Sequence, residues 1–361
     1  MSKPKILIVG AGAVGLAQGF HLANGAEITY LVRPGRKPAF SPPKKLYDYK
    51  ENTIRTFDGY RVVESTAEVA GEEFYCVFDT LDGYTARSEG GAATIKSVGD
   101  LIRDSKNTFV VYDAFGLDID LYYETTMGLP KNRLFLAASM LAHQPTTSIP
   151  IPPSADKDLI AQADLLYSAN AGNTGLVVIN TQPALTQKFE HVYNKNGKLK
   201  VQKIPGFAGR IGTTLAFPQL VAWNLDGYQD IEHLRQNTEI WNLLIKAQKE
   251  VLTLPRFGWT GWALSWIVGS WVTGKMLSAP VAGAAPLSYK DFNAFHHGGK
   301  VAKQDIEMLE DLVAEGEKKG HKMPALREIV RRGNETQEAK AKAGTLLGVP
   351  GSTDQSVRKR V

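Results

Sequence analysis

Short apolar runs alternate with helical patterns along the first half of the chain. Apolar runs at Lys5–Val9 and Glu27–Val32 flank a helical pattern over Ala13–Asn24, which ends at Gly25. Similar runs predict further strands at Tyr60–Glu64, Phe74–Phe78, Thr108–Tyr112, Arg133–Ala138 and Gly175–Asn180, with a helix over Thr94–Asp104. Strands that alternate with helices in this way predict an α/β fold with a doubly wound parallel sheet.

The pattern changes from strands to helices near Pro205. Apolar positions three and four residues apart predict helices over Asp230–Thr253 and Val301–Lys319, and Gly320 ends the second of these. A last short helix is expected over Leu326–Arg332. The second half of the chain is therefore predicted to be mainly α-helical.

These patterns predict two domains and a tail. Residues 1–204 would form the sheet domain, and residues 205–335 a helical substrate and dimerisation domain. The proline-rich stretch Pro145–Pro153 is expected to be a surface loop. The chain is polar and charged from Gly333 onward, so residues 336–361 are predicted to be a flexible tail.

Composition narrows the class of protein. The 361 residues are 43% apolar and 22% charged, as in ordinary globular proteins, and the net charge is +5. Much of the positive excess lies near the two ends, which favours a basic nucleotide-phosphate site and a solvated tail over nucleic-acid binding. Cys76 is the single cysteine, so no internal disulfide forms and a reducing, cytoplasmic compartment is expected. No zinc-site spacing of Cys and His is present, and no metal is expected.

The clearest motif follows the first predicted strand, in KILIVGAGAVG. Its glycines, Gly10, Gly12 and Gly15, have the spacing of a dinucleotide-binding loop between a strand and a helix. The first permits a tight turn, the second lets the backbone approach a pyrophosphate, and the third lets the helix pack closely. The cofactor loop is therefore predicted to comprise Gly10, Ala11, Gly12, Ala13, Val14 and Gly15, in a Rossmann-type domain.

The residues after the second strand indicate which dinucleotide binds. An acidic side chain at this position usually binds the ribose hydroxyl of NAD, but TYLVRPGRK places Arg33 there, with Arg36 close behind. A guanidinium has the charge and the forked donors that suit a 2′-phosphate. The predicted cofactor is therefore NADP, as NADPH.

Three stretches resemble the ketopantoate reductase family. They are the opening KILIVGAGAVGLAQGFHLANGAEITYLVRPGR, the strand and turn FVVYDAFGLD, and the closing KQDIEMLEDLVAEGEKKGHKMPALREIV. The resemblance implies a Rossmann domain, a helical domain and a substrate held between them. It also implies NADPH-dependent reduction of a 2-keto acid.

The chain departs from the family at its polar site residues. The family's substrate-binding asparagine corresponds to Asp113, and its closing-helix glutamate to Gln304 or Asp305. The family's lysine has no clear match, because the corresponding region contains Arg210 and the next lysine downstream is Lys246. A second lysine, often found after the fourth strand, is replaced by DTLDG. Asp113 and Asp305 are the predicted catalytic residues, and the substrate is expected to differ from ketopantoate.

Two further groups of residues carry alternatives. Trp259, Trp262, Trp266 and Trp271 would form an aromatic helix face in a wide substrate pocket, a core or dimer interface, or a membrane contact. His296 and His297 precede the closing helix, and one of them is a candidate proton donor.

The sequence thus predicts an oxidoreductase that transfers hydride from NADPH to a 2-keto acid or larger ketone. Its partners would be a small-molecule substrate and a second copy of the chain, with no nucleic acid and no membrane. Two alternatives stay open: an imine-reducing, opine-type dehydrogenase, which an essential His296 or His297 would favour, and a non-catalytic NADP-binding regulator.

Overall fold

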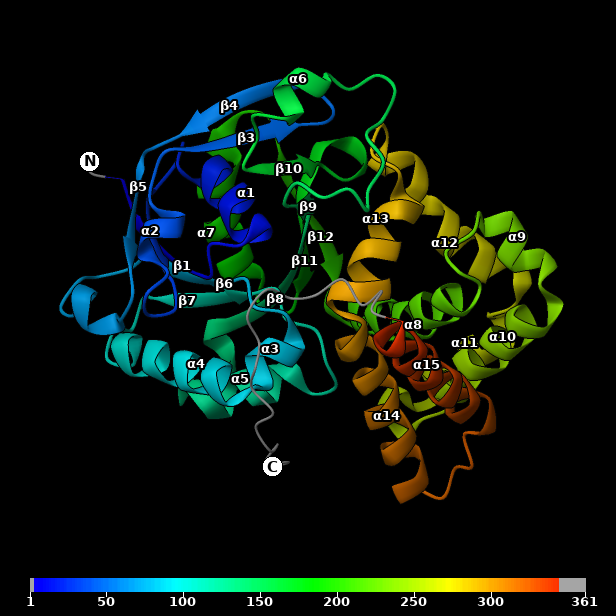
Figure 1. Ribbon diagram of the computed structural model, residues 1–361. Helices are drawn as coiled ribbons and strands as arrows, with labels where there is room; N and C mark the ends of the chain where they lie inside the picture. The colour runs from blue at the N-terminus through cyan, green and yellow to red at the C-terminus, as the bar shows by residue number, and fades with distance from the viewer. Residues whose placement is uncertain (1–2, 344–361) are drawn as a thin grey trace.

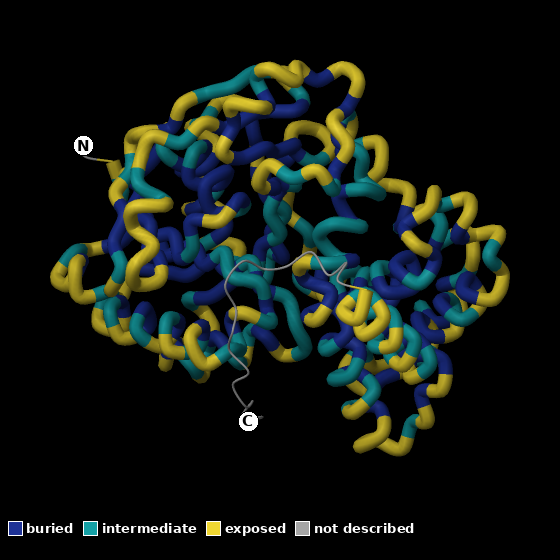
Figure 2. Tube along the Cα trace, in the orientation of Figure 1, coloured by how far each residue is buried: buried dark blue, intermediate teal, exposed yellow. Residues whose placement is uncertain are grey.

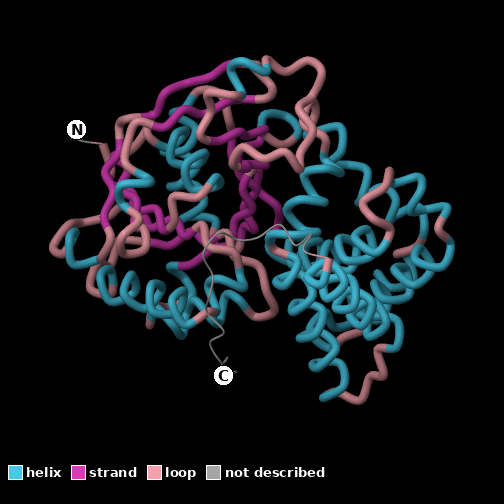
Figure 3. Tube along the Cα trace, in the orientation of Figure 1, coloured by secondary structure: helices cyan, strands magenta, loops and turns pink. Residues whose placement is uncertain are grey.

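The computed structural model describes residues 3–343 and contains two β-sheets followed by a helical half (Figures 1 and 3). The larger sheet has the strand order β12-β11-β8-β7-β6-β1-β2-β5. Its strands are β1 (Lys5–Val9), β2 (Glu27–Leu31), β5 (Tyr60–Val63), β6 (Cys76–Asp79), β7 (Phe109–Tyr112), β8 (Leu134–Ser139), β11 (Thr174–Asn180) and β12 (Lys200–Pro205). Every strand predicted from the apolar runs is confirmed, and β12 is added to them.

Six of these strands are parallel, in the order β5-β2-β1-β6-β7-β8. The chain moves from β1 outward through β2 to β5, then returns to add β6 on the other side of β1. The strand order therefore reverses between β1 and β6, and ligands of doubly wound sheets bind at the carboxyl ends of the strands beside such a point. The prediction of an N-terminal Rossmann-type parallel sheet is confirmed.

The second sheet was not expected from the sequence. Its order is β4-β3-β10-β9, with β3 (Lys44–Asp48), β4 (Thr53–Phe57), β9 (Leu141–His143) and β10 (Leu165–Ser168). The strands are short, and β3 pairs with β10 from more than a hundred residues away, so local periodicity gives little sign of them.

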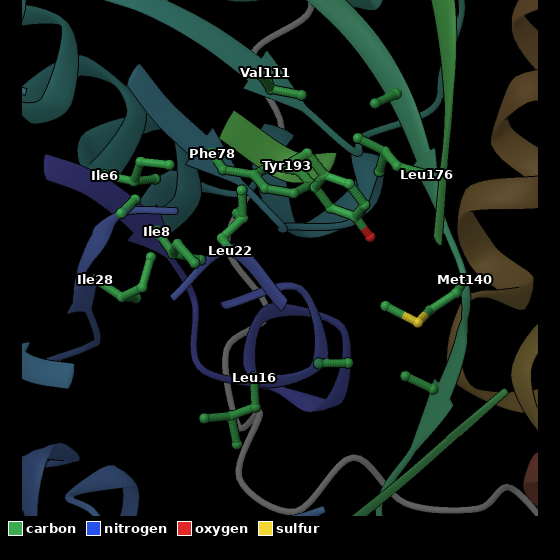
Figure 4. Packing of buried hydrophobic residues seen from close by; sticks show 14 of the residues in the cluster. Ile6, Ile8, Leu16, Leu22, Ile28, Phe78, Val111, Met140, Leu176 and Tyr193 are labelled. Carbon is green, nitrogen blue, oxygen red and sulfur yellow. The ribbon is translucent and has the colours of Figure 1, made fainter. Parts of the chain in front are cut away.

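Helices and the second sheet cover the two faces of the larger sheet. On one face, α1 (Ala13–Leu22) contacts β1, β9, β10 and α7 (Pro183–Tyr193), and Figure 4 shows side chains of α1, β1, β6 and α7 meeting in one core. On the other face lie α4 (Glu89–Ile102) and α5 (Ile119–Met127). The α4 helix begins earlier than predicted, because Ser88 accepts a hydrogen bond from the Gly91 N–H and caps it. Cys76 is completely buried in the α1-side core, as the apolar run around it indicates.

The second half of the described chain is helical, as predicted, and α8 (Gly206–Leu225) follows β12 directly. Helix α8 packs against α10 (Thr238–Leu252), α14 (Ala302–Lys318) and α15 (Pro324–Lys342), and buried residues concentrate there and around the larger sheet (Figure 2). The helix predicted over Asp230–Thr253 is divided, because the Asn237 side chain caps a new helix at Thr238. The remaining helices are α2 (Lys37–Phe40), α3 (Gly83–Arg87), α6 (Lys157–Ile160), α9 (Ile231–Gln236), α11 (Gly258–Ile267), α12 (Ser270–Ala284) and α13 (Tyr289–Phe295).

The prediction of a flexible tail over residues 336–361 is wrong for its first seven residues, where α15 continues to Lys342. Gly333 lies against Val221 of α8 and Ile306 of α14, so the helix is held by packing that its polar sequence hides. Near its end, the Lys340 ammonium donates to the Asn224 side chain. The rest of the predicted tail, residues 344–361, lies outside the described residues.

Candidate active site

The glycine loop lies at the carboxyl end of β1, beside the reversal of the sheet. Gly10 has a φ of +90°, a conformation that side chains disfavour, and its N–H donates to the Leu31 carbonyl at the end of β2. From the other side, the Thr80 hydroxyl donates to the Val9 carbonyl, 2.8 Å away. The loop is thus tied to both neighbouring strands, and its turn matches the role predicted for Gly10.

Gly12 and Gly15 have opposite surroundings, which fits a loop built to receive a phosphate group. A Cβ atom on Gly15 would lie 2.2 Å from the Gly10 carbonyl oxygen, so only glycine lets α1 approach the loop this closely. A Cβ atom on Gly12 would meet no atom within 4 Å. No side chain caps the first turn of α1, and its N–H groups therefore face the open side of the loop. These residues fit a dinucleotide pyrophosphate.

Arg33 and Arg36 follow β2 and are both exposed. Within the part of the chain that the structure describes, Arg33 has no ion pair, whereas Lys37 engages Glu64 through its backbone N–H and Glu68 through its ammonium. Arg36 lies over the Phe40 ring, 5.6 Å from its centre. Because the Gly10 N–H is hydrogen-bonded to the end of β2, Arg33 lies near the glycine loop. Its charge is available to bind a phosphate group there.

Two carboxyl groups lie at the carboxyl ends of the next strands. Asp79 ends β6 and accepts hydrogen bonds from the Leu81 N–H and the Tyr123 hydroxyl, both at 2.9 Å. Asp113 follows β7 and accepts from the Ser139 N–H at 3.2 Å. Burial raises the pKa of each carboxyl group to about 7, and the charge of Asp79 contributes to the rise at Asp113. Asp113 therefore takes up a proton near neutral pH and can then donate as well as accept, which partly restores the chemistry of an asparagine.

The two halves of the chain meet beside Asp113. The Gly83 N–H at the start of α3 donates to the Gln304 side chain in α14. A Cβ atom on Gly83 would lie 1.7 Å from the Phe115 carbonyl oxygen, so the turn after β7 is in direct contact with α3. Phe115 in turn packs against Phe217 of α8, with 6.2 Å between ring centres. Asp113 is two residues before Phe115, and Asp305 directly follows Gln304. The two carboxyl groups thus lie beside these contacts, one in each half of the chain.

The segment before α14 is a single π-helical turn, His296–Lys300. Such turns are rare and often accompany functional sites. His297 lies in this turn with its Nδ1 atom 2.8 Å from Asp305 Oδ2, and Asp305 is almost wholly buried. The other oxygen of Asp305 is buried without a partner among the described residues. Burial raises the pKa of Asp305, and the His297 partner opposes that rise.

Lys300 ends the same π-helical turn and is the cation that sequence reasoning did not find. Burial lowers the pKa of both His143 and His296, and the charge of Lys300 lowers both further. Lys300 is exposed, yet partial desolvation by the surrounding protein lowers its pKa, and Asp82 opposes the shift. The π-helical turn therefore supplies a lysine and a histidine just before α14, whose Gln304 contacts the start of α3.

Other residues considered from the sequence lie elsewhere. Lys246 is exposed on α10, and Arg210 pairs with Asp120 at 3.0 Å near the start of α8. The four tryptophans are exposed, so a buried core position for them is wrong. A shallow hollow of about 650 Å³ lies at the amino ends of β1 and β2, between Lys5 and Glu27, away from the glycine loop. Asp79 and Ser139 reach Asp113 only through tertiary contacts, and the sequence carries no local signal for them.

No protein-family model matches the chain, and no curated protein matches it in sequence. Six parallel strands within the larger sheet, with a glycine loop at their reversal and a helical half after them, define a Rossmann-type fold. Solved structures place it more narrowly. The 2-dehydropantoate 2-reductase of Geobacter metallireducens aligns with a TM-score of 0.62 and 14% identity, over 92% of this chain and 99% of its own.

Two further structures have the same architecture. D-mandelate dehydrogenase, solved with NADH and anilino(oxo)acetate, aligns with a TM-score of 0.62 at 11% identity, over 93% of this chain and 98% of its own. The dimeric ketopantoate reductase of Staphylococcus aureus aligns with a TM-score of 0.59 at 11% identity, over 93% and 99%. The chain therefore has the ketopantoate reductase fold, in a divergent sequence, as the resemblance implied.

Proposed function

We propose that the chain is an NADPH-dependent reductase of a keto compound, a 2-keto acid or a larger ketone. The observation that carries the proposal is the contact between the two halves beside the sheet: Gln304 accepts from the Gly83 N–H at the start of α3, and the neighbouring Asp305 pairs with His297 of the π-helical turn. Gly10 to Gly15 would hold the pyrophosphate, and Arg33 and Arg36 the 2′-phosphate. When bound, the dihydronicotinamide supplies the hydride.

His297 is the proposed proton donor to the substrate oxygen. Its Nδ1 atom faces the buried Asp305 carboxylate, which holds one orientation of the ring and leaves Nε2 for the substrate. Asp305 is then a positioning residue rather than a group that touches the substrate. A positioned acid of this kind contributes about 10²- to 10⁴-fold in rate.

Lys300 and Asp113 would bind the substrate. The Lys300 ammonium can neutralise a substrate carboxylate, because the nearby His143 and His296 are held neutral by burial and by its own charge. Asp113, protonated near neutral pH, can donate to a carbonyl or carboxylate oxygen from the opposite side. This pair supports a 2-keto acid over a neutral ketone.

The test is NADPH oxidation by the full-length protein across 2-keto acids, larger neutral ketones and imines formed from keto acids and amines. We expect turnover with a keto acid, loss of turnover in His297→Gln, and a raised KM in Lys300→Met. His233→Gln is the matched control, because His233 forms a similar pair with Asp226, 2.9 Å away on α9. NADPH binding without turnover of any compound would overturn the assignment as an enzyme. It would support the alternative, a non-catalytic NADP-binding regulator.

An imine-reducing enzyme of the opine type is the second candidate. Two features favour this activity: His297 is paired with the Asp305 carboxylate, and α8 contains no lysine. Turnover only with a keto acid and an amine together would identify this activity. The dimeric state named for the Staphylococcus aureus reductase also supports a homodimer here.

A further inference from the structure

Five large apolar side chains stand exposed on one small part of the helical half. Helix α11 is ten residues long and is followed after two residues by α12. The exposed fractions are 79% for Trp259, 58% for Trp262, 74% for Trp266, 64% for Ile267 and 73% for Trp271. Single exposed apolar residues are ordinary, but a cluster of this size marks a surface that contacts something else. We call these five residues the tryptophan face.

The spacing on α11 explains why the tryptophans share one side. Trp259, Trp262 and Trp266 are three and four residues apart, and the rings of the last two lie 6.0 Å apart. Gly261 and Ser265 occupy the opposite, buried side, and Gly261 lies directly against the Leu252 carbonyl at the end of α10. The protein therefore holds α11 by small residues and turns its large rings outward.

The segment that carries this face has charges of one sign. Residues 251–290 contain Arg256, Lys275 and Lys290 and no aspartate or glutamate. Arg256 and Lys290 are paired with acidic residues from other segments, whereas Lys275 lies over the Trp271 ring, 6.0 Å from its centre. Helix α10, which packs against α11, adds the exposed Lys246 and Lys249, and neither has an ion pair among residues 3–343. The apolar face is thus bordered by free positive charge.

We infer that the tryptophan face docks the protein onto an anionic lipid bilayer surface. Indole rings favour the boundary between acyl chains and headgroups, where the ring is buried and its N–H stays hydrated. Lysines near such a surface add attraction to its anionic headgroups. A second copy of the chain fits less well, because a symmetric pairing would place the same lysines opposite one another without acidic partners from this segment.

The geometry makes this contact peripheral. A ten-residue helix is about 15 Å long, half the thickness of a bilayer core. No helix among the described residues is long and apolar enough to cross a membrane. The helix would therefore lie in the interface plane, with the tryptophan rings as its anchors.

The test is co-sedimentation of the full-length protein with phosphatidylcholine vesicles, with and without about 30% phosphatidylserine. We expect binding to the anionic vesicles with a blue shift of tryptophan emission, and binding about tenfold weaker or more for Trp262→Ala/Trp266→Ala and for neutral vesicles. Lys275→Glu should weaken only the binding to anionic vesicles. Leu121→Ala is the matched control, because Leu121 is 59% exposed on α5, away from this face.

Light scattering on the same proteins tests whether a second copy of the chain, rather than a lipid surface, covers the tryptophan face. Absence of binding to anionic vesicles, or equal binding by the double variant and the wild type, would overturn the inference. A wild-type dimer that becomes monomeric in Trp262→Ala/Trp266→Ala, with no vesicle binding, would assign the face to a second copy instead. Circular dichroism and thermal unfolding of the double variant check that it folds; its exposed side chains leave the core unchanged.

Discussion

His297 Nδ1 lies 2.8 Å from Asp305 Oδ2, and this pair joins the π-helical turn to the first turn of α14. The pair follows from the unusual geometry of the turn, since His297 and Asp305 are eight residues apart and a continuous α-helix would separate them by about 12 Å, more than two turns. The turn thus orients a histidine toward the carboxyl end of the parallel sheet.

The first prediction concerns Asp305→Asn in the proposed reductase. The amide no longer stabilises the charged ring, so kcat should fall about 10²-fold or more while NADPH binding stays unchanged. The pH dependence of kcat should also change shape, which a purely structural defect would not cause. Steady-state kinetics across pH check this, with NADPH affinity measured by fluorescence. An unaltered pH profile in Asp305→Asn would remove His297 from the proton-donor role.

The second prediction separates the two glycines of the loop. Gly12→Ala should leave the free protein as stable as the wild type, because its Cβ atom enters open space, yet it should weaken NADPH binding by occupying the phosphate position. Gly15→Ala should lower the free energy of unfolding by about 1–3 kcal/mol, because its Cβ atom would meet the Gly10 carbonyl oxygen. Thermal unfolding with and without NADPH measures both effects. A stable Gly12→Ala protein with full NADPH affinity would contradict the loop's assignment.

Local signals predicted the fold well and the site only in part. The glycine loop and Arg33 were found because each role follows from a few consecutive residues beside one strand. Asp113 and Asp305 were placed near the junction of the two halves, although the pairing of Asp305 with His297 was not foreseen. Lys300 was missed because its importance depends on a π-helical turn that no sequence pattern indicates.

The errors also have physical causes. The strands β3 and β4 escaped notice because their pairing partners are distant or their apolar residues few. A core position for the tryptophans was wrong, since apolar spacing on a helix does not say what covers that side. In α15, the buried Gly333 fits a close helix contact that its polar neighbours conceal.

The third prediction tests the choice of dinucleotide. Arg33→Glu should raise the dissociation constant of NADPH about 10- to 100-fold, because a charged hydrogen bond to the 2′-phosphate is replaced by repulsion. The affinity for NADH, which lacks this phosphate, should not fall. Arg36→Ala is the comparison, since Arg36 already contacts the Phe40 ring and its loss should cost less. Fluorescence titration with both cofactors measures the change, and equal weakening for NADH and NADPH would argue against a 2′-phosphate site.

The fourth prediction is a pH dependence of stability that originates at Asp79. Burial raises the pKa of this carboxyl group to about 7 in the folded protein, against about 3.9 in an unfolded chain. Because the folded state binds the proton more tightly, the contribution of Asp79 to the free energy of unfolding is full below about pH 4 and is lost as pH rises to about 7. Asp79→Asn removes this dependence, since an amide carries no proton that titrates.

Urea unfolding at pH 5 and pH 8 measures the effect. Between pH 5 and pH 8, the free energy of unfolding of Asp79→Asn should rise by on the order of 2 kcal/mol relative to that of the wild type. The reason is that only the wild type is destabilised by a buried charge at pH 8. The amide can still accept from the Leu81 N–H, so the β6–α3 loop keeps its geometry. Asp104→Asn, at an exposed position after α4, should show the same change in stability between the two pH values as the wild type. If the free energy of unfolding of Asp79→Asn changed with pH as that of the wild type does, the prediction would be wrong. The two hydrogen-bond donors would then stabilise the Asp79 carboxylate in the fold despite its complete burial.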